Sequence, residues 1–278
     1  MQSNNPVFRR SEEFNRPGAT AYAGSGYTDP ATWGTGTPGV PSAPTTAQQP
    51  MTIDSVVQKT AAALAVVIVT AAITWVMSPD VGTGTDPSSI SGLFAVAGLG
   101  ALGAFALSMV NSFKRVISPA LVLLFCAFEG VALGAISKVF ELAYPGVVPA
   151  AVLGTFGAFA GTLAVYKFFN IKVGSKFRTM VIAAMFGMIG IGLIEMVLGM
   201  FGAQIGLFGM GGVGLLFAVA GLVLGVFMLV LDFDFVEQGI ANRIPDREGW
   251  RAAFAMTVSL VWIYTNLLRI LAILRGSD

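Results

Sequence analysis

Three carboxylates gather in one short stretch of the sequence. Asp232, Asp234 and Glu237 fall within six positions, directly after thirty-six residues, 196–231, that carry no charge. Carboxylate oxygens attract hard cations and change charge with pH, so this stretch could bind a cation or respond to acid. The plain alternative is that the three acids form the solvated end of a helix.

The remaining reactive side chains exclude several kinds of chemistry. The chain has no histidine, and its single cysteine, Cys126, allows neither an intramolecular disulfide nor a thiolate cluster for zinc or iron–sulfur. We find no Gly-x-Ser-x-Gly motif, no phosphate-binding loop and no metal triad. An intramembrane protease would need a second aspartate facing Asp232. The sequence therefore predicts a protein that is not an enzyme and has no cofactor, and no nucleic-acid partner is expected.

Composition indicates that a bilayer surrounds these residues. Hydrophobic residues make up 55% of the chain and charged residues only 11%, whereas about 25% of an ordinary soluble domain is charged. A bilayer core roughly 30 Å thick requires about twenty apolar residues per helix. Strands of a barrel would alternate apolar and polar residues, and no such alternation is present. We therefore predict an all-α integral membrane protein within residues 51–278, with seven transmembrane helices at about 56–77, 90–111, 118–140, 147–169, 179–200, 213–236 and 251–274.

Four further polar side chains fall inside these apolar blocks. Glu129, Glu195, Asn266 and Arg269 would lie at membrane depth, where an ionisable group costs roughly 2.5 to 3.5 kcal/mol and normally faces the bundle interior or water. Asn266 and Arg269 are three residues apart and so share one helix face. We interpret the four as interior polar groups. In the alternative reading, Glu195 reaches outward to the surface and Arg269 only neutralises a carboxylate.

Positive residues predict the orientation. With a cytoplasmic N-terminus, thirteen of the sixteen Lys and Arg residues fall on the inside, as the positive-inside rule requires. The expected location is the cell membrane, with multiple crossings, the N-terminus in the cytoplasm and the C-terminus outside.

Two compositional features complete the organisation. Residues 1–50 hold seven of the thirteen prolines, together with many Gly, Thr and Ser, and are expected to be a disordered cytoplasmic tail. Three GxxxG pairs predict close helix packing in the third, fourth and sixth blocks. They are Gly130 with Gly134, Gly157 with Gly161, and Gly221 with Gly225.

Several stretches resemble one known family. The third block, "ALVLLFCAFEGVALGAISKVFE", followed by "YPGVV" and "AVLGTFGAF", together with "LVLDFDFVEQGI" and "WIYTNLLRILAIL", is similar to the Bax inhibitor-like membrane proteins, in the version found in actinobacteria. The resemblance covers residues 51–275. It implies two layers of three helices around a central C-terminal helix.

The resemblance also implies a function. Bacterial members are described as calcium-leak channels, shut by two aspartates in the last two helices that are latched to a basic residue of the second helix. Position by position, these residues correspond to Asp232, Asn266, and Lys114 or Arg115. Since an Asp–Asn pair cannot share a proton, we expect weaker or acid-shifted pH gating unless Asp234 or Glu237 supplies the second carboxylate.

Two other functions stay open at this point. The expected function is a cation leak, with Ca²⁺ or another cation as the permeant ion and Asp232 as a weak Ca²⁺ contact, because the chain contains no EF-hand spacing. One alternative is a non-conducting stress regulator that binds a membrane protease or another membrane protein. The other is a cation- or proton-coupled transporter.

Overall fold

Seven long helices form the part of the chain that the structure describes. The computed structural model describes residues 49–78, 87–169 and 171–276, so the expected tail lies outside the described residues except for its last two positions. Each long helix is apolar enough to cross a bilayer, which confirms an all-α fold with seven spanning helices. The helices are α2 (Ile53–Met77), α3 (Pro87–Phe113), α4 (Pro119–Ala143), α5 (Val147–Phe168), α6 (Ser175–Met200), α7 (Gly212–Ala241) and α8 (Gly249–Gly276), with a short 3-10 turn, η2 (Asp246–Glu248), before α8.

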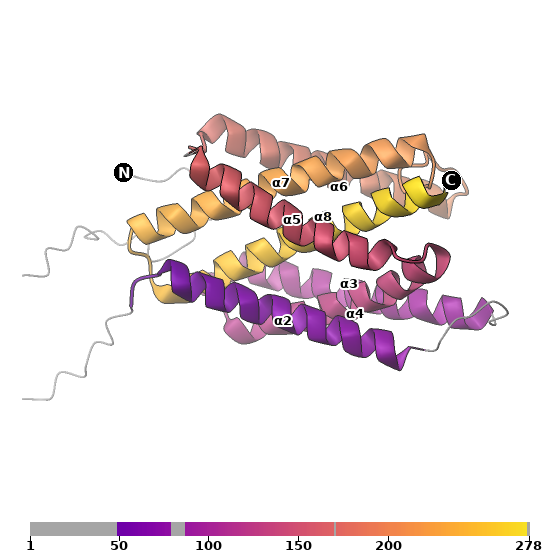
Figure 1. Ribbon diagram of the computed structural model, residues 1–278, viewed down its shortest axis with the longest axis horizontal. Helices are drawn as coiled ribbons and strands as arrows, with labels where there is room; N and C mark the ends of the chain where they lie inside the picture. The colour runs from indigo at the N-terminus through magenta and orange to yellow at the C-terminus, as the bar shows by residue number, and fades with distance from the viewer. Residues whose placement is uncertain (1–48, 79–86, 170, 277–278) are drawn as a thin grey trace, which may run out of the picture.

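The helices form two layers with α8 between them. Figure 1 shows α2, α3 and α4 on one side of α8 and α5, α6 and α7 on the other. α4 packs against α2 and α3, and α7 packs against α5 and α6, while α8 contacts members of both layers. This is the arrangement that the resemblance implied. The last helix is therefore placed to carry any function that depends on both layers.

Local chemistry explains several helix ends. Thr52 caps α2 by accepting a hydrogen bond from the Ser55 amide, and the Ser55 side chain accepts one from the Thr52 amide in return. Pro119 begins α4, where a missing N–H costs nothing. Gly146 separates α4 from α5 with φ of 85°, a conformation that favours glycine.

The two ends of the bundle differ in charge. We call the basic end the one that holds the start of α8 and the end of α7, and the far end the opposite one. Among the described residues, the far end holds Lys138, Arg269 and Arg275. The basic end holds Lys59, Lys114, Arg115, Lys167, Lys172, Lys176, Arg178, Arg243, Arg247 and Arg251.

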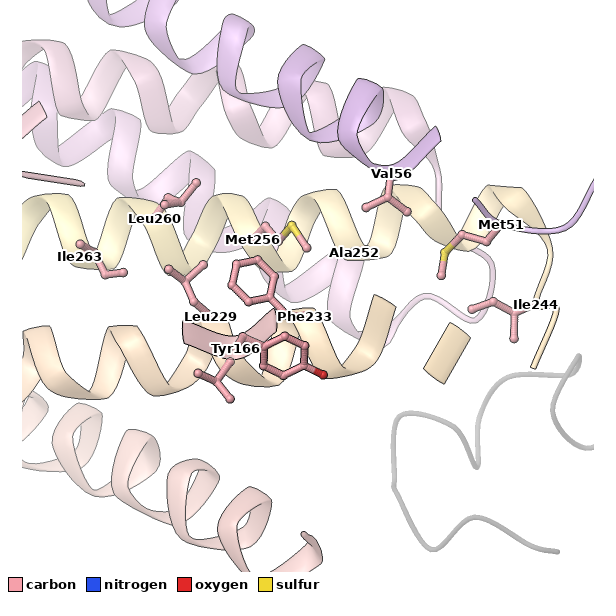
Figure 2. Packing of buried hydrophobic residues seen from close by; sticks show 11 residues of the cluster. Met51, Val56, Tyr166, Leu229, Phe233, Ile244, Ala252, Met256, Leu260 and Ile263 are labelled. Atoms are coloured by element: carbon pink, nitrogen blue, oxygen red, sulfur yellow. The ribbon is translucent and has the colours of Figure 1, made fainter. Parts of the chain in front are cut away.

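A hydrophobic cluster joins the layers at the basic end. Figure 2 shows Phe233 of α7 beside Tyr166 of α5 and Met256 of α8. Met51, just before α2, belongs to the same cluster and is only 2% exposed. Its amide donates to the Ile244 carbonyl at 2.8 Å, so the segment that enters α2 is fixed to the connection between α7 and α8.

The three GxxxG pairs have different outcomes. A side chain at Gly134 would collide with the backbone of Ala71 in α2, and one at Gly225 would lie 2.7 Å from Ile263 of α8. The pairs on α4 and α7 therefore allow close packing, as predicted. Gly157 and Gly161 on α5 have open space around them, so the prediction of close helix packing is wrong for that pair.

Candidate functional site

The three clustered acids lie in the last turns of α7 and have different partners. Asp232 is partly buried and accepts a 2.6 Å hydrogen bond from the Ser259 hydroxyl of α8. Among the described residues, no Lys or Arg forms an ion pair with Asp232. The side-chain partner of Asp232 is therefore a hydroxyl group, which leaves the carboxyl group available to a cation.

Asp234 and Glu237 face α5 and α6 instead. Asp234 is only 7% exposed and pairs with Arg178 of α6 at 2.8 Å, and it also accepts a hydrogen bond from Gln238 at 2.7 Å. Glu237 is exposed and accepts a 2.6 Å hydrogen bond from the Tyr166 hydroxyl of α5. These contacts hold helices together. The interpretation as a merely solvated helix end therefore fits Glu237 best and Asp234 least.

Asp232 and Asn266, which the resemblance pairs, have different partners in the structure. Asn266 donates its side-chain amide to the Trp262 carbonyl of its own helix at 2.8 Å and packs against Gly221 of α7. Ser259, the actual partner of Asp232, precedes Asn266 by seven residues, which is about 10 Å along a helix. α7 does continue past Asp232 to Ala241, but the antiparallel register between α7 and α8 brings Ser259 to Asp232.

Polar groups of α8 form a line along α7. Ser259, Trp262, Asn266 and Arg269 are spaced by three, four and three residues, so they share one face of the helix. The Trp262 indole donates to the Gly221 carbonyl at 2.8 Å, deep in the apolar part of α7. We call this contact the α7–α8 seam. It runs from Asp232 and Ser259 at the basic end to Gly214 and Arg269 at the far end.

An apolar contact interrupts the seam. Ile263 is fully buried, and an added Cβ at Gly225 would lie 2.7 Å from Ile263 Cγ1 and 3.0 Å from Trp262 Cδ1. No room is left there for a hydrated ion. The two helices are thus in close contact in the middle of the seam and polar toward both of its ends.

The two candidate latch residues lie at the basic end, between α3 and α4. The Arg115 carbonyl accepts a hydrogen bond from Arg251 at 3.1 Å, which ties this connection to α8. In the described ranges, neither Lys114 nor Arg115 forms an ion pair with Asp232. Their role as a latch stays a prediction.

The three interior charges occupy different environments. Glu129 lies partly buried in the middle of α4 and has no hydrogen-bond partner within the described part of the chain. Glu195 is 6% exposed and accepts hydrogen bonds from the amides of residues 205–207, so it does not reach outward. Arg269 donates to the carbonyls of Leu207 and Gly209 and, among the described residues, pairs with no carboxylate.

Sequence reasoning missed three partners of the acids, Ser259, Arg178 and Tyr166. Ser259 is an uncharged residue within an apolar stretch of α8, so only the register between α7 and α8 shows that it contacts Asp232. Neither Arg178 nor Tyr166 was among the residues predicted for the site. The helical spacing of Ser259 with Asn266 and Arg269 was the available signal.

The oxygen ligands at the basic end do not form a closed metal site. Among the described residues, no group of three or more His, Cys, Asp or Glu side chains could hold a metal ion. Ca²⁺ takes 6–8 oxygen ligands in its stable protein sites. Asp232 and Ser259 could therefore supply only part of a cation's shell, with water as the remainder.

Fold and seam together define a class of protein, a multi-pass helical membrane protein with polar side chains along the contact of its last two helices. The family model described as Bax inhibitor 1 like matches residues 5–276. The chain belongs to this family, which confirms the resemblance. No curated protein matches the chain significantly.

Proposed function

We propose that the protein is a cation leak channel of the cell membrane, with Ca²⁺ as a permeant ion and with its basic end in the cytoplasm. The observation that carries the proposal is the Asp232 carboxylate, which is partly buried at one end of the α7–α8 seam with a hydroxyl as its partner and no basic residue. Ionisable side chains that face the interior of a membrane-spanning bundle mark ion pathways, proton relays or voltage sensors.

The seam supplies the remaining parts of such a channel. Asp232 attracts a cation to the basic end, and the Ser259 hydroxyl offers it a second oxygen. The contact of Gly225 with Ile263 and Trp262 closes the middle of the seam in this state. In this proposal, conduction requires α7 and α8 to separate there, and the described arrangement corresponds to a closed form.

The seam also determines how pH should act. Two carboxylates in contact share a proton near neutrality, whereas Asp232 beside a serine has no such partner. We therefore propose that the wild-type protein lacks the pH dependence that a proton shared between two carboxylates would give. Ser259→Asp would place a second carboxylate beside Asp232, and Asn266→Asp would place one about 10 Å away along α8.

The experiment measures Ca²⁺ entry into liposomes that contain only this protein, at pH 6, 7 and 8. We expect leak in the wild type, less leak in Asp232→Asn, and a new pH dependence in Ser259→Asp that the matched control Asn266→Asp lacks. If Asn266→Asp gains the pH dependence and Ser259→Asp does not, the assignment of Ser259 is wrong. If no variant conducts, the channel proposal is refuted, and a regulator that acts through a membrane partner becomes the better hypothesis.

A further inference from the structure

Two arginines of α8 hold loops at the far end. Arg269 donates to the carbonyls of Leu207 and Gly209, which lie between α6 and α7. Arg275 donates to the carbonyl of Pro145, between α4 and α5. Each guanidinium thus binds backbone oxygen atoms of a connection that α8 itself does not belong to.

A glutamate holds the amides of each of these loops. Glu195 of α6 accepts hydrogen bonds from the amides of Ile205, Gly206 and Leu207 at 2.9, 2.8 and 3.1 Å. Glu141 of α4 accepts them from the amides of residues 146 and 148 at 2.6 and 2.9 Å. Hydrogen bonds from backbone amides to a carboxylate are among the stronger ones in proteins.

The two loops therefore share one construction. A glutamate near the end of the preceding helix binds N–H groups, and an arginine of α8 binds C=O groups of the same short segment. We call them the α6–α7 clamp, made by Glu195 and Arg269, and the α4–α5 clamp, made by Glu141 and Arg275. Since opposite charges act on opposite ends of the loop peptides, each clamp stabilises a single loop conformation.

Only the α6–α7 clamp covers the seam. A Cβ at Gly214, in the first turn of α7, would collide with the Gly209 carbonyl and lie 2.9 Å from the Arg269 guanidinium. The Phe208 ring lies 5.5 Å from Arg269 and 5.8 Å from the Phe217 ring of α7, and a Cβ at Gly192 of α6 would meet it at 3.2 Å. The loop therefore contacts α6, α7 and α8 at the far end of the seam.

Arg269 adds an electrostatic barrier at the same place. Its Nε is buried and, within the described residues, has no hydrogen-bond acceptor. Its positive charge, which is not compensated by an ion pair there, disfavours any cation that approaches along the seam. The α4–α5 clamp offers a comparison, because it joins α4 and α5 to the last turn of α8 and carries the same types of residue.

We propose that the α6–α7 clamp closes the far end of the α7–α8 seam, with Glu195 and Arg269 as positioning residues that hold residues 201–211 over it. The inference rests on the proposed leak function. It assigns Glu195 and Arg269 to the closure of the far end of the seam, whereas Asp232 and Ser259 belong to the basic end. Release of either clamp residue should then raise the leak rate, while loss of the Asp232 charge lowers it.

Two measurements on the same proteoliposomes test the clamp. Amide hydrogen exchange reports the order of the loop, and Ca²⁺ entry reports closure. For Glu195→Ala and Arg269→Met we expect amides 205–207 to exchange about tenfold faster or more, and Ca²⁺ entry to rise about threefold or more. The matched controls Glu141→Ala and Arg275→Met should speed exchange at residues 146 and 148 and leave Ca²⁺ entry at the wild-type rate.

Conservative variants guard against misfolding. Glu195→Gln keeps one acceptor oxygen and Arg269→Lys keeps the charge, so both should fold and show smaller changes in the same direction. Faster loop exchange with unchanged Ca²⁺ entry, in a protein whose leak still falls in Asp232→Asn, would overturn the clamp and leave the channel proposal intact. No Ca²⁺ entry in any variant, including those with a released loop, would overturn both proposals.

Discussion

Replacement of Gly134 by alanine should destabilise the protein. The new Cβ would lie 2.9 Å from the Ala71 Cα of α2 and closer still to the Ala71 carbonyl oxygen. These are backbone atoms, which cannot rotate away, so α2 and α4 have to separate. Forced packing of this kind costs about 1–3 kcal/mol. α4 also contacts α3 and α8, and the separation would disturb both contacts.

The α5 pair provides the matched control for Gly134→Ala. Gly157 has open space around it, so Gly157→Ala should only stiffen α5 and stabilise the protein by about 0.5–1 kcal/mol. Thermal unfolding in one detergent should place the two midpoints roughly 3–16 °C apart, since 1 kcal/mol shifts the midpoint by about 2–4 °C at this size. A Gly134→Ala midpoint equal to or above that of Gly157→Ala would refute the packing assignment.

Two further predictions concern the basic end. Met51→Ala should lower the free energy of unfolding by about 2–5 kcal/mol because it empties a buried position. Val57→Ala, at a residue that is 58% exposed, should change this free energy little. Equal losses in chemical unfolding would show that Met51 does not anchor this end. Arg178→Gln and Asp234→Asn should be coupled by about 0.5–3 kcal/mol in a double-mutant cycle, and additive effects would mean that the ion pair does not join α6 to α7.

Much of the fold was predictable from composition. Apolar blocks of about twenty residues leave a helix as the only structure that satisfies its own backbone in lipid, so the seven helices follow directly. The acids after residue 231 were identifiable because ionisable groups are rare and costly at that depth. The residues that carry charge in the bundle were thus predicted, and their partners were not.

Register explains the missing partners. A contact between α7 and α8 depends on how far one helix is shifted along the other. A shift of one helical turn changes every pair of contacting residues. The sequence predicted Asn266 and Arg269 as polar residues on one face of the last helix, and only the structure shows that Ser259 meets Asp232. The role of Glu195 was hidden for a related reason, because its partners are backbone amides, which no sequence pattern marks.

The central position of α8 has a consequence for biosynthesis. Of the helices described, α8 leaves the ribosome last, yet it contacts α2, α4, α5 and α7. Until it inserts, the Ser137 hydroxyl of α4 lacks Tyr264, and Asp232 lacks Ser259. The two layers therefore cannot reach their final packing during synthesis. A nascent chain stopped before Gly249 would present unpaired polar groups in the bilayer, the kind of signal by which membrane quality control can recognise an unfinished protein.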